Sequence, residues 1–294
     1  MLLHNSDAGD EDHSADAITA LVANAGHEVA YHSLDGPDWQ QALVEAVDLV
    51  AIAGGDGTVR KVLTAMAERE QALVTVLPLG SANNIAHAFG LGRSPEELVA
   101  GWSTATRRRF RLGDLRAPER REIFVETVGG GLFAEAIKHA ERVEEDDDDK
   151  VELGLRVLRR LVDEMPLQPW HLVLDGVEHH GDYLAVEAMV IGETGPRVPL
   201  APAARPEDRL IDVVLVGEED RKQLRRYLEA RLADRPQPVP RFEVQRCMKA
   251  ELQPLAAASM RIDDELWDIS SWTATGGRAD VSVTPVVIEL LVSG

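Results

Sequence analysis

A glycine-rich loop follows an apolar segment near residue 50. The run Asp48–Ala53 (DLVAIA) predicts a strand that is buried on both faces, and Gly54–Thr58 (GGDGT) follows it directly. Glycines let backbone N–H groups approach phosphate oxygens, and the N-terminus of the helix expected after this loop also favours anions. The negative charge of Asp56 suits the loop if Mg²⁺ lies between it and the phosphates. A tight turn without a ligand is the competing interpretation.

A second loop of small residues favours phosphate binding. Leu73–Leu77 predicts another buried strand, which ends in Pro78–Ser81 (PLGS), with Asn83 and Asn84 close behind. In an open α/β sheet, ligands bind beyond the carboxyl ends of the strands, so two such loops side by side would form a phosphate cradle. The loops match neither a Walker A loop nor a GxGxxG fingerprint, because the Lys and the glycine spacing of those motifs are absent.

The elements around these loops predict an α/β domain. Ser14 is a good N-cap for a helix that ends before Gly26, His27–His32 predicts a short strand, and Pro37 suits the start of the next helix. Helices are also expected after both loops, the second from about 83 to 89. Strands that alternate with helices indicate a parallel sheet covered by helices.

The chain becomes richer in strands after about Thr106. Strands are expected over Ile123–Val128, His171–Leu174, Leu184–Ile191, Leu210–Val216 and Val281–Leu291, and helices over Val151–Glu164 and Glu219–Ala233. The predicted domains are therefore a phosphate-binding α/β domain (1–106), a β-rich second domain (107–280) and a C-terminal segment (281–294) that can return to the first domain.

Two short motifs in the second domain have open interpretations. His179–His180 is expected in a hairpin loop, and the sequence contains no HExxH or Cys/His zinc spacing. Gly129–Gly131 suits either the close approach of a ligand or a closely packed strand end.

Composition limits the partners. The 294 residues suffice for about two domains, and the net charge of −20 excludes a general electrostatic hold on nucleic acid. Cys247 is the single cysteine, so no internal disulfide can form, and we interpret it as an ordinary strand residue. No apolar run approaches the length of a transmembrane helix, and the N-terminus turns polar too early for a signal peptide. We therefore expect a cytoplasmic protein.

Charged clusters have two interpretations each. The acidic run Glu144–Asp149 is interpreted as a solvated loop, with metal binding as the minor alternative. The basic clusters Arg107–Arg109 with Arg111, and Arg156 with Arg159–Arg160, are interpreted as solvated surface, with contact to lipid headgroups as the alternative.

The two glycine-bearing loops carry a resemblance to a known family. GGDGTVRKVLTAM (54–66) and VTVLPLGSANNIAHAFGL (74–91) closely resemble the diacylglycerol kinase catalytic-domain family, which includes bacterial lipid kinases, sphingosine kinases and ceramide kinases. Weaker likenesses at 4–9, 201–216 and 262–267 extend it across most of the chain. The resemblance implies an α/β N-terminal domain (Rossmann-like, of the NAD kinase and diacylglycerol kinase type) plus a β-sandwich C-terminal domain, with ATP in the cleft between them.

The same resemblance implies an activity. The γ-phosphoryl group of ATP would pass, with Mg²⁺, to the hydroxyl of a diacylglycerol-like lipid, as in phospholipid biosynthesis. The lipid substrate would come from the membrane surface, which adds a peripheral location at the inner membrane face. No nucleic acid partner is expected, and a homodimer is left open.

Roles for individual residues follow from the resemblance. The catalytic residues would be Glu265, as the general base, and Asp56. The metal site would be the Asp208 carboxylate with the backbone carbonyls of Arg205 and Leu210. The nucleotide-binding residues would be Asn5, Gly54, Gly55, Asp56, Gly57, Thr58, Gly80, Ser81 and Asn84.

The chain departs from the family pattern in ways that keep alternatives open. Ser81 stands for the usual Thr, Asn84 for an Asp, Phe133 for an acid, and Asp264 and Arg209 for glycines. Glu135 is a candidate replacement for one lost acid, the turn at Asp264 suits a left-handed backbone, and Asp263 is an alternative base. The rival functions are a nucleotide-binding homologue with little or no kinase activity, and an NAD kinase, which shares the GGDGT loop.

Overall fold

A computed structural model describes residues 1–9, 13–36, 39–67, 73–142, 149–256 and 259–293. The chain forms two compact units, Met1–Phe110 with Val286–Gly294, and Arg111–Pro285. The predicted fold class, an α/β domain followed by a sheet-rich domain, is confirmed. Pro37 and almost all of the acidic run lie outside the described residues. None of the helices in those ranges is long and apolar enough to cross a membrane.

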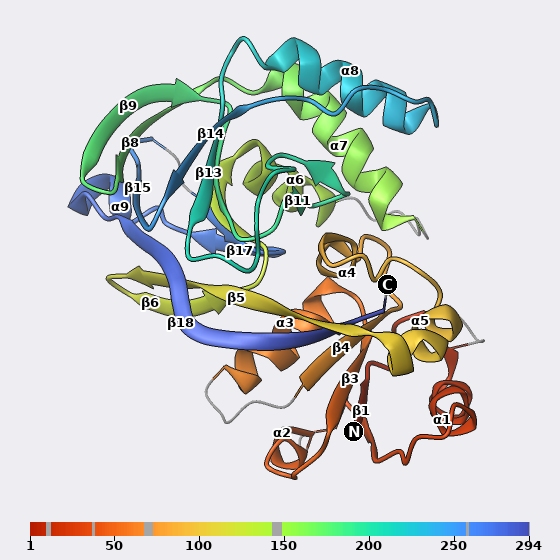
Figure 1. Cartoon of the computed structure of the whole chain (residues 1–294). Helices are drawn as coiled ribbons and strands as arrows, with labels where there is room; N and C mark the ends of the chain where they lie inside the picture. Colours follow the sequence, from red (N-terminus) through yellow and green to blue (C-terminus); the bar gives the residue numbers. More distant parts are fainter. Residues whose placement is uncertain (10–12, 37–38, 68–72, 143–148, 257–258, 294) are drawn as a thin grey trace. The chain divides into compact units, whose positions relative to one another are not determined.

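Parallel strands form the sheet of the first unit (Figure 1), in the order β2–β1–β3–β4–β18. The strands are β1 (Leu2–His4), β2 (Tyr31–Ser33), β3 (Leu49–Gly54), β4 (Leu73–Pro78) and the last residues of β18 (Ala279–Val292). Val50 lies opposite Val74, which in turn lies opposite Leu290, and all three side chains are buried. The strand predicted over His27–His32 is wrong in its bounds, because pairing with β1 begins only at Tyr31.

The helices of the first unit are α1 (Ala15–Asn24), α2 (Trp39–Ala42), α3 (Asp56–Met66), α4 (Asn84–Ala88) and α5 (Pro95–Gly101). Ser14 caps α1 as predicted, since its side chain accepts a hydrogen bond from the amide of Ala17. The apolar face of α3 is buried. Both α3 and α4 start directly after a glycine-bearing loop, as the sequence predicts.

Two sheets form most of the second unit. One is antiparallel, in the order β14–β13–β10–β7–β16–β17, and the other continues from β18 through β15 and β8 to β9. Their strands are β7 (Thr127–Gly131), β8 (Gln168–Leu174), β9 (Val177–Tyr183), β10 (Ala185–Met189), β13 (Ile211–Val216), β14 (Glu243–Cys247), β15 (Lys249–Pro254), β16 (Ser259–Ile262) and β17 (Glu265–Asp268). Strand β5 (Thr106–Ala117) pairs with β18 and with β6 (Arg120–Phe124).

The helices of the second unit are α6 (Leu132–Ala140), α7 (Lys150–Glu164), α8 (Arg221–Leu232) and α9 (Trp272–Thr275). Figure 1 shows α7 beside α8, and apolar residues of both helices share a buried core with α6 and β13. The prediction of only two helices is wrong, because α6 and α9 were not expected. Helix α6 starts where Gly131, with a positive φ of 87°, turns the chain out of β7.

Strand pairing decides between the interpretations of the two short motifs in this unit. His179 and His180 lie inside β9, and the turn of the hairpin is Asp175–Gly176, so their expected loop position is wrong. Gly129 lies in β7, where a side chain would meet Glu187 of β10 at 2.3 Å. The packed-strand interpretation of these glycines therefore holds.

Cys247 ends β14 and is 2% exposed. Burial, with smaller contributions from Asp175 and Asp212, raises the pKa of its thiol to about 12. Because the thiolate is the reactive form, we expect the folded protein to react with a disulfide reagent at pH 8 at least about 100-fold more slowly than the denatured chain. Thiol titration with and without denaturant measures this, and equal rates would contradict the buried position.

Candidate functional site

The two glycine-bearing loops of the first unit touch each other. A Cβ atom on Gly80 would lie 2.5 Å from the Cα atom of Gly55, and one on Gly55 would lie 3.2 Å from the Cα atom of Gly80. Real side chains do not tolerate the shorter distance against backbone, so Gly80 is required for this contact. Gly55 is also the N-cap of α3 and supplies no side chain to the helix end. The first turn of α3 therefore presents backbone N–H groups and a partial positive charge to an anion.

Asp56 connects the two loops. Its carboxylate accepts hydrogen bonds from the amides of Asn84 (2.9 Å) and Ile85 (3.0 Å) in the first turn of α4. A carboxylate at a helix N-terminus is favoured by the helix dipole. The acid in the loop thus has a structural reason to be there. Each of the two amides bonds a different oxygen of the carboxylate.

Asn83 closes the second loop. Its backbone is left-handed, with φ 53°, and its side chain bonds both the N–H and the carbonyl of Gly80. Asparagine tolerates this conformation better than most residues. The bonds fix Gly80 against Gly55, while the neighbouring Ser81 is exposed.

Asn5 adds a third strand end to this group. It follows β1, its amide donates to the carbonyl of Ala53 (3.0 Å), and its Nδ2 donates to the Thr58 hydroxyl (3.2 Å). The residues predicted to bind nucleotide therefore lie together at the carboxyl ends of β1, β3 and β4. Their role stays a prediction.

Glu265 lies in the second unit at the start of β17. Its side chain is 55% exposed and forms an ion pair with Arg120 at 3.3 Å. Arg120 also pairs with Glu122 and lies 5.7 Å from the centre of the Trp267 ring. The carboxylate of Glu265 is therefore accessible to solvent, which is compatible with the predicted role as a base.

Asp263 is buried and fully engaged. Its carboxylate accepts hydrogen bonds from the amides of Val125, Glu126 and Thr127. Its φ is 52°, so the left-handed residue of the β16–β17 turn is Asp263 and not Asp264 as expected. Three amide donors favour the charged form of a carboxylate, so Asp263 is poorly placed to take a proton from a substrate.

The sequence patterns did not predict one buried ion pair of the second unit. Arg261 binds both carboxylate oxygens of Glu187, at 3.1 and 3.0 Å, and donates to Thr194 and to the carbonyl of Asp263. The side chains of the pair are 3% and 0% exposed. Removal of one partner from such a pair typically costs about 3–5 kcal/mol. The available signal was one acid within the apolar run Leu184–Ile191 and one arginine between Met260 and Ile262.

Phe133, which stands where the family has an acid, is buried beneath the guanidinium of Arg261. Glu135, the candidate replacement, approaches Lys138 and the hydroxyl of Ser259, each at 3.4 Å. Phe133 therefore belongs to the core of the second unit, and Glu135 already has a basic partner.

The residues predicted to bind a metal lie around the guanidinium of Arg246 instead. Asp208 accepts from the amide of Leu210 (2.9 Å) and from Arg246, and the carbonyl of Arg205 accepts from the amide of Asp208 (3.1 Å). Arg246 also pairs with Asp212 at 3.2 Å. Its bond to Asp208 raises the pKa of Arg246, while burial raises the pKa of Asp212. The residues as placed do not fit a divalent cation unless Arg246 moves.

The arginines of the predicted basic clusters are largely paired: Arg107 with Glu289, Arg156 with Glu152, Arg159 with Asp163 and Glu229, and Arg160 with Glu164. These pairs are what the solvated-surface interpretation expects. Contact with lipid headgroups stays a prediction.

Comparison with known proteins points to the same family. Residues 1–115 match the model of the diacylglycerol kinase catalytic domain. This part of the chain is therefore similar to the catalytic domain of that family. A Pseudomonas aeruginosa protein named probable lipid kinase YegS-like is 29% identical over 227 residues, which cover 74% of this chain and 71% of that protein. A protein of the same name from Chromohalobacter salexigens is 31% identical over 122 residues, 39% of this chain and 38% of that protein.

Two solved structures, one of a diacylglycerol kinase and one of an NAD kinase, share the fold. A putative diacylglycerol kinase from Bacillus anthracis superposes with a TM-score of 0.74 at 16% identity, over 99% of this chain and 96% of that one. An NAD kinase from Archaeoglobus fulgidus, in complex with ATP, gives 0.54 at 11% identity, over 99% and 93%. The fold inferred from the diacylglycerol kinase resemblance is thus confirmed across the chain.

The contact between the two loops generates a first prediction for this site. Gly80→Ala places a methyl group against the backbone of Gly55 and should separate the loops, so we expect ATP with Mg²⁺ to bind at least about 10-fold more weakly. Titration calorimetry measures this, and thermal unfolding checks the fold. Gly36→Ala is the control, since no atom lies within 4 Å of its added methyl. Unchanged ATP affinity in Gly80→Ala would show that the nucleotide does not bind at these loops.

The Asp208 cluster generates a second prediction. In Arg246→Met the two carboxylates lose their guanidinium, so we expect Mn²⁺ to bind there more tightly than in the natural chain. Arg246→Lys keeps the positive charge and should behave like the natural chain. Electron paramagnetic resonance of Mn²⁺ reports the free ion, and equal affinity in all three proteins would exclude a cation site at Asp208.

Proposed function

We propose that the chain is an ATP- and Mg²⁺-dependent lipid kinase, which transfers the γ-phosphoryl group of ATP to the hydroxyl of a diacylglycerol-like lipid. The observation that carries the proposal is the contact of Gly54–Thr58 with the loop around Gly80, in a domain similar to the diacylglycerol kinase catalytic domain. The names of the relatives support a lipid as acceptor. ATP in the archaeal NAD kinase supports ATP as donor.

The loops of the first unit would bind the nucleotide phosphates. Glycine backbones and the N-terminus of α3 supply N–H groups, and Asn5 and Thr58 supply polar side chains beside them. Mg²⁺, when bound, would neutralise charge on the transferred group, with Asp56, which lies within these loops, holding it through water. Phosphoryl transfer requires mainly positioning and charge stabilisation, and a loop locked by Asp56 and Gly80 is suited to positioning.

Glu265 would accept the proton of the lipid hydroxyl. Of the acids in the Asp263–Glu265 turn, Asp263 is committed to three amides, whereas the side chain of Glu265 is 55% exposed and pairs with Arg120 at 3.3 Å. A lipid hydroxyl would have to approach the side of the carboxylate that Arg120 leaves open.

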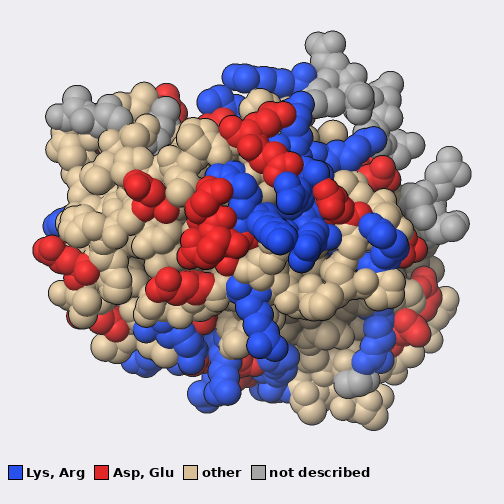
Figure 2. Space-filling view, turned by 90° about the horizontal axis from the view of Figure 1, so that it is seen from above, with Lys and Arg blue, Asp and Glu red and all other residues tan. Residues whose placement is uncertain are grey.

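Access to lipid would use the basic side chains of α8. Figure 2, which looks onto the side of the second unit that carries α8, shows Lys and Arg gathered among Asp and Glu. Lys222 and Arg226 are exposed there. Each basic residue close to an anionic membrane contributes about 1 kcal/mol of attraction. On a chain with net charge −20, such a local patch would orient the protein on the membrane.

A nucleotide-binding homologue with little kinase activity is the second candidate. The burial of Phe133 at a position that is acidic in the family, and the use of Asp56 as a helix cap, favour it. An NAD kinase is the weaker alternative, because the diacylglycerol kinase structure superposes better than the NAD kinase structure, with TM-scores of 0.74 and 0.54.

Glu265→Gln tests whether Glu265 is the general base. The amide keeps size and hydrogen bonding but cannot take a proton, so we expect lipid phosphorylation to fall about 10²- to 10⁴-fold while ATP affinity stays the same. Asp264→Asn, in the same turn, is the matched control and should retain turnover within a few fold. A Glu265→Gln protein with natural turnover would assign the base elsewhere.

A further inference from the structure

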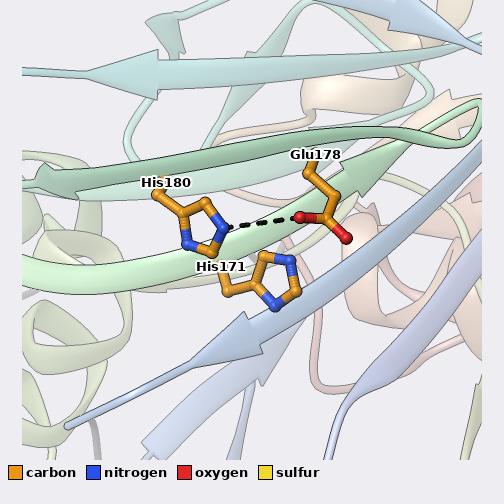
Figure 3. Close-up of side chains that lie close together, drawn as sticks. All are labelled: His171, Glu178 and His180. Carbon is orange, nitrogen blue, oxygen red and sulfur yellow. Dashed lines mark ion pairs between the residues drawn. The ribbon is translucent and has the colours of Figure 1, made fainter.

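Three polar side chains meet on the hairpin of β8 and β9. In the antiparallel register His171 lies directly opposite His180, and Glu178 lies two residues before His180 on the same face. The imidazole rings are stacked, with centroids 4.3 Å apart and planes 4° from parallel, and the Glu178 carboxylate lies 3.7 Å from Nε2 of His180 (Figure 3). On β8 the core face is occupied by Trp170 and Leu172 instead.

A glutamine on the next strand prepares His171 as a ligand. Gln253 of β15 lies opposite His171, and its Nε2 donates to the carbonyl of Gly276 (3.2 Å). Its Oε1 is therefore the atom that faces Nδ1 of His171, at 3.1 Å. An oxygen acceptor at Nδ1 places the proton there and leaves a lone pair on Nε2. That Nε2 is buried and has no hydrogen-bond partner among the described residues.

We propose that His171, His180 and Glu178 bind a divalent transition metal, Zn²⁺ being the ion that best suits them. One ligand atom from each of the three lies within 4.8 Å of the others. Ligands about 2.0–2.1 Å from a tetrahedral Zn²⁺ lie closer together than this, so the exposed side chains of His180 and Glu178 must rotate inward and the rings must tilt out of the stack. Two imidazoles and one carboxylate leave a fourth position for water.

The ligand set separates this metal from the Mg²⁺ of the proposed kinase reaction. Imidazole nitrogens suit Zn²⁺, Ni²⁺ or Cu²⁺, whereas Mg²⁺ prefers oxygen ligands in octahedral geometry. Gln253 acts here as a positioning residue, in the way that carbonyl groups commonly hold the second nitrogen of a metal-bound histidine. The buried lone pair of His171 would gain the partner that it lacks.

The bound ion would clamp the edge of a sheet. Strand β9 ends the order β18–β15–β8–β9, and no further strand of the described residues pairs with its outer side. A metal that joins β8 to β9 through side chains would hold this edge strand in register. This role is independent of the kinase reaction and does not rest on it.

Zn²⁺ titration of the full chain tests the proposal. We expect one Zn²⁺ to bind per chain in competition with a chromophoric chelator, and Zn²⁺ but not Mg²⁺ to raise the unfolding temperature. His180→Ala should weaken Zn²⁺ binding at least about 10-fold and abolish the rise. His179→Ala is the matched control, since that side chain points to the other face of β9, and it should bind as the natural chain does.

Gln253→Leu tests whether Gln253 positions His171 for the metal, because it leaves both histidines in place. Loss of the carbonyl should weaken Zn²⁺ binding about 10- to 100-fold and shift the proton of His171 between its ring nitrogens, which ¹⁵N NMR detects. Unchanged Zn²⁺ affinity in His180→Ala, or an equal loss in His179→Ala, would overturn the site. A Gln253→Leu protein with natural affinity and an unchanged His171 tautomer would overturn the positioning role.

Discussion

The close approach of Gly55 and Gly80 is the constraint on which the candidate nucleotide site depends. Parallel strands β3 and β4 end side by side, and their loops approach this closely because Gly80 carries no side chain, whose Cβ would lie 2.5 Å from the Cα atom of Gly55. Asp56 and Asn83 then hold the loops in place, one through the amides of α4 and the other through both backbone groups of Gly80. The phosphate-binding chemistry inferred for these glycines is thus a by-product of a packing requirement that the fold imposes.

The second unit uses several of its acids for structure. Asp263 holds the start of β7 through three amides, Glu187 neutralises buried Arg261, and Asp208 and Asp212 share Arg246. Each of these carboxylates has a partner that explains its place. Glu265 differs, because its side chain is 55% exposed and pairs with Arg120 near the surface, and its role as a base stays a proposal.

Local patterns predicted the first unit well. Buried strands appear as continuous apolar runs, and helix starts appear as Ser14 or as glycine loops, so β3, α3, β4 and α4 could be found from the sequence. The short strand β2 was misplaced because pairing with Leu2, and not any local pattern, decides where it begins. The loops were also correctly grouped, since the ends of parallel strands must share an edge.

Contacts between residues far apart in the chain could not be predicted from the sequence. The engagement of Asp56 by α4, and that of Asp208 by Arg246, depends on residues 28 and 38 positions away. The left-handed residue is Asp263 and not the expected Asp264, because the register of β16 against β17 decides which residue takes that position in the turn. His171 and His180 form a pair only once β8 and β9 are paired, so a search for zinc spacings along the chain could not find them.

The most direct test of the central claim is transfer of labelled γ-phosphate from ATP to a panel of lipids in mixed vesicles with Mg²⁺, with NAD as a parallel acceptor. The account predicts label in a lipid that carries a free hydroxyl, such as diacylglycerol, and loss of that label in Gly80→Ala and in Glu265→Gln. Label in NAD, or tight ATP binding with no label in any lipid, would contradict it.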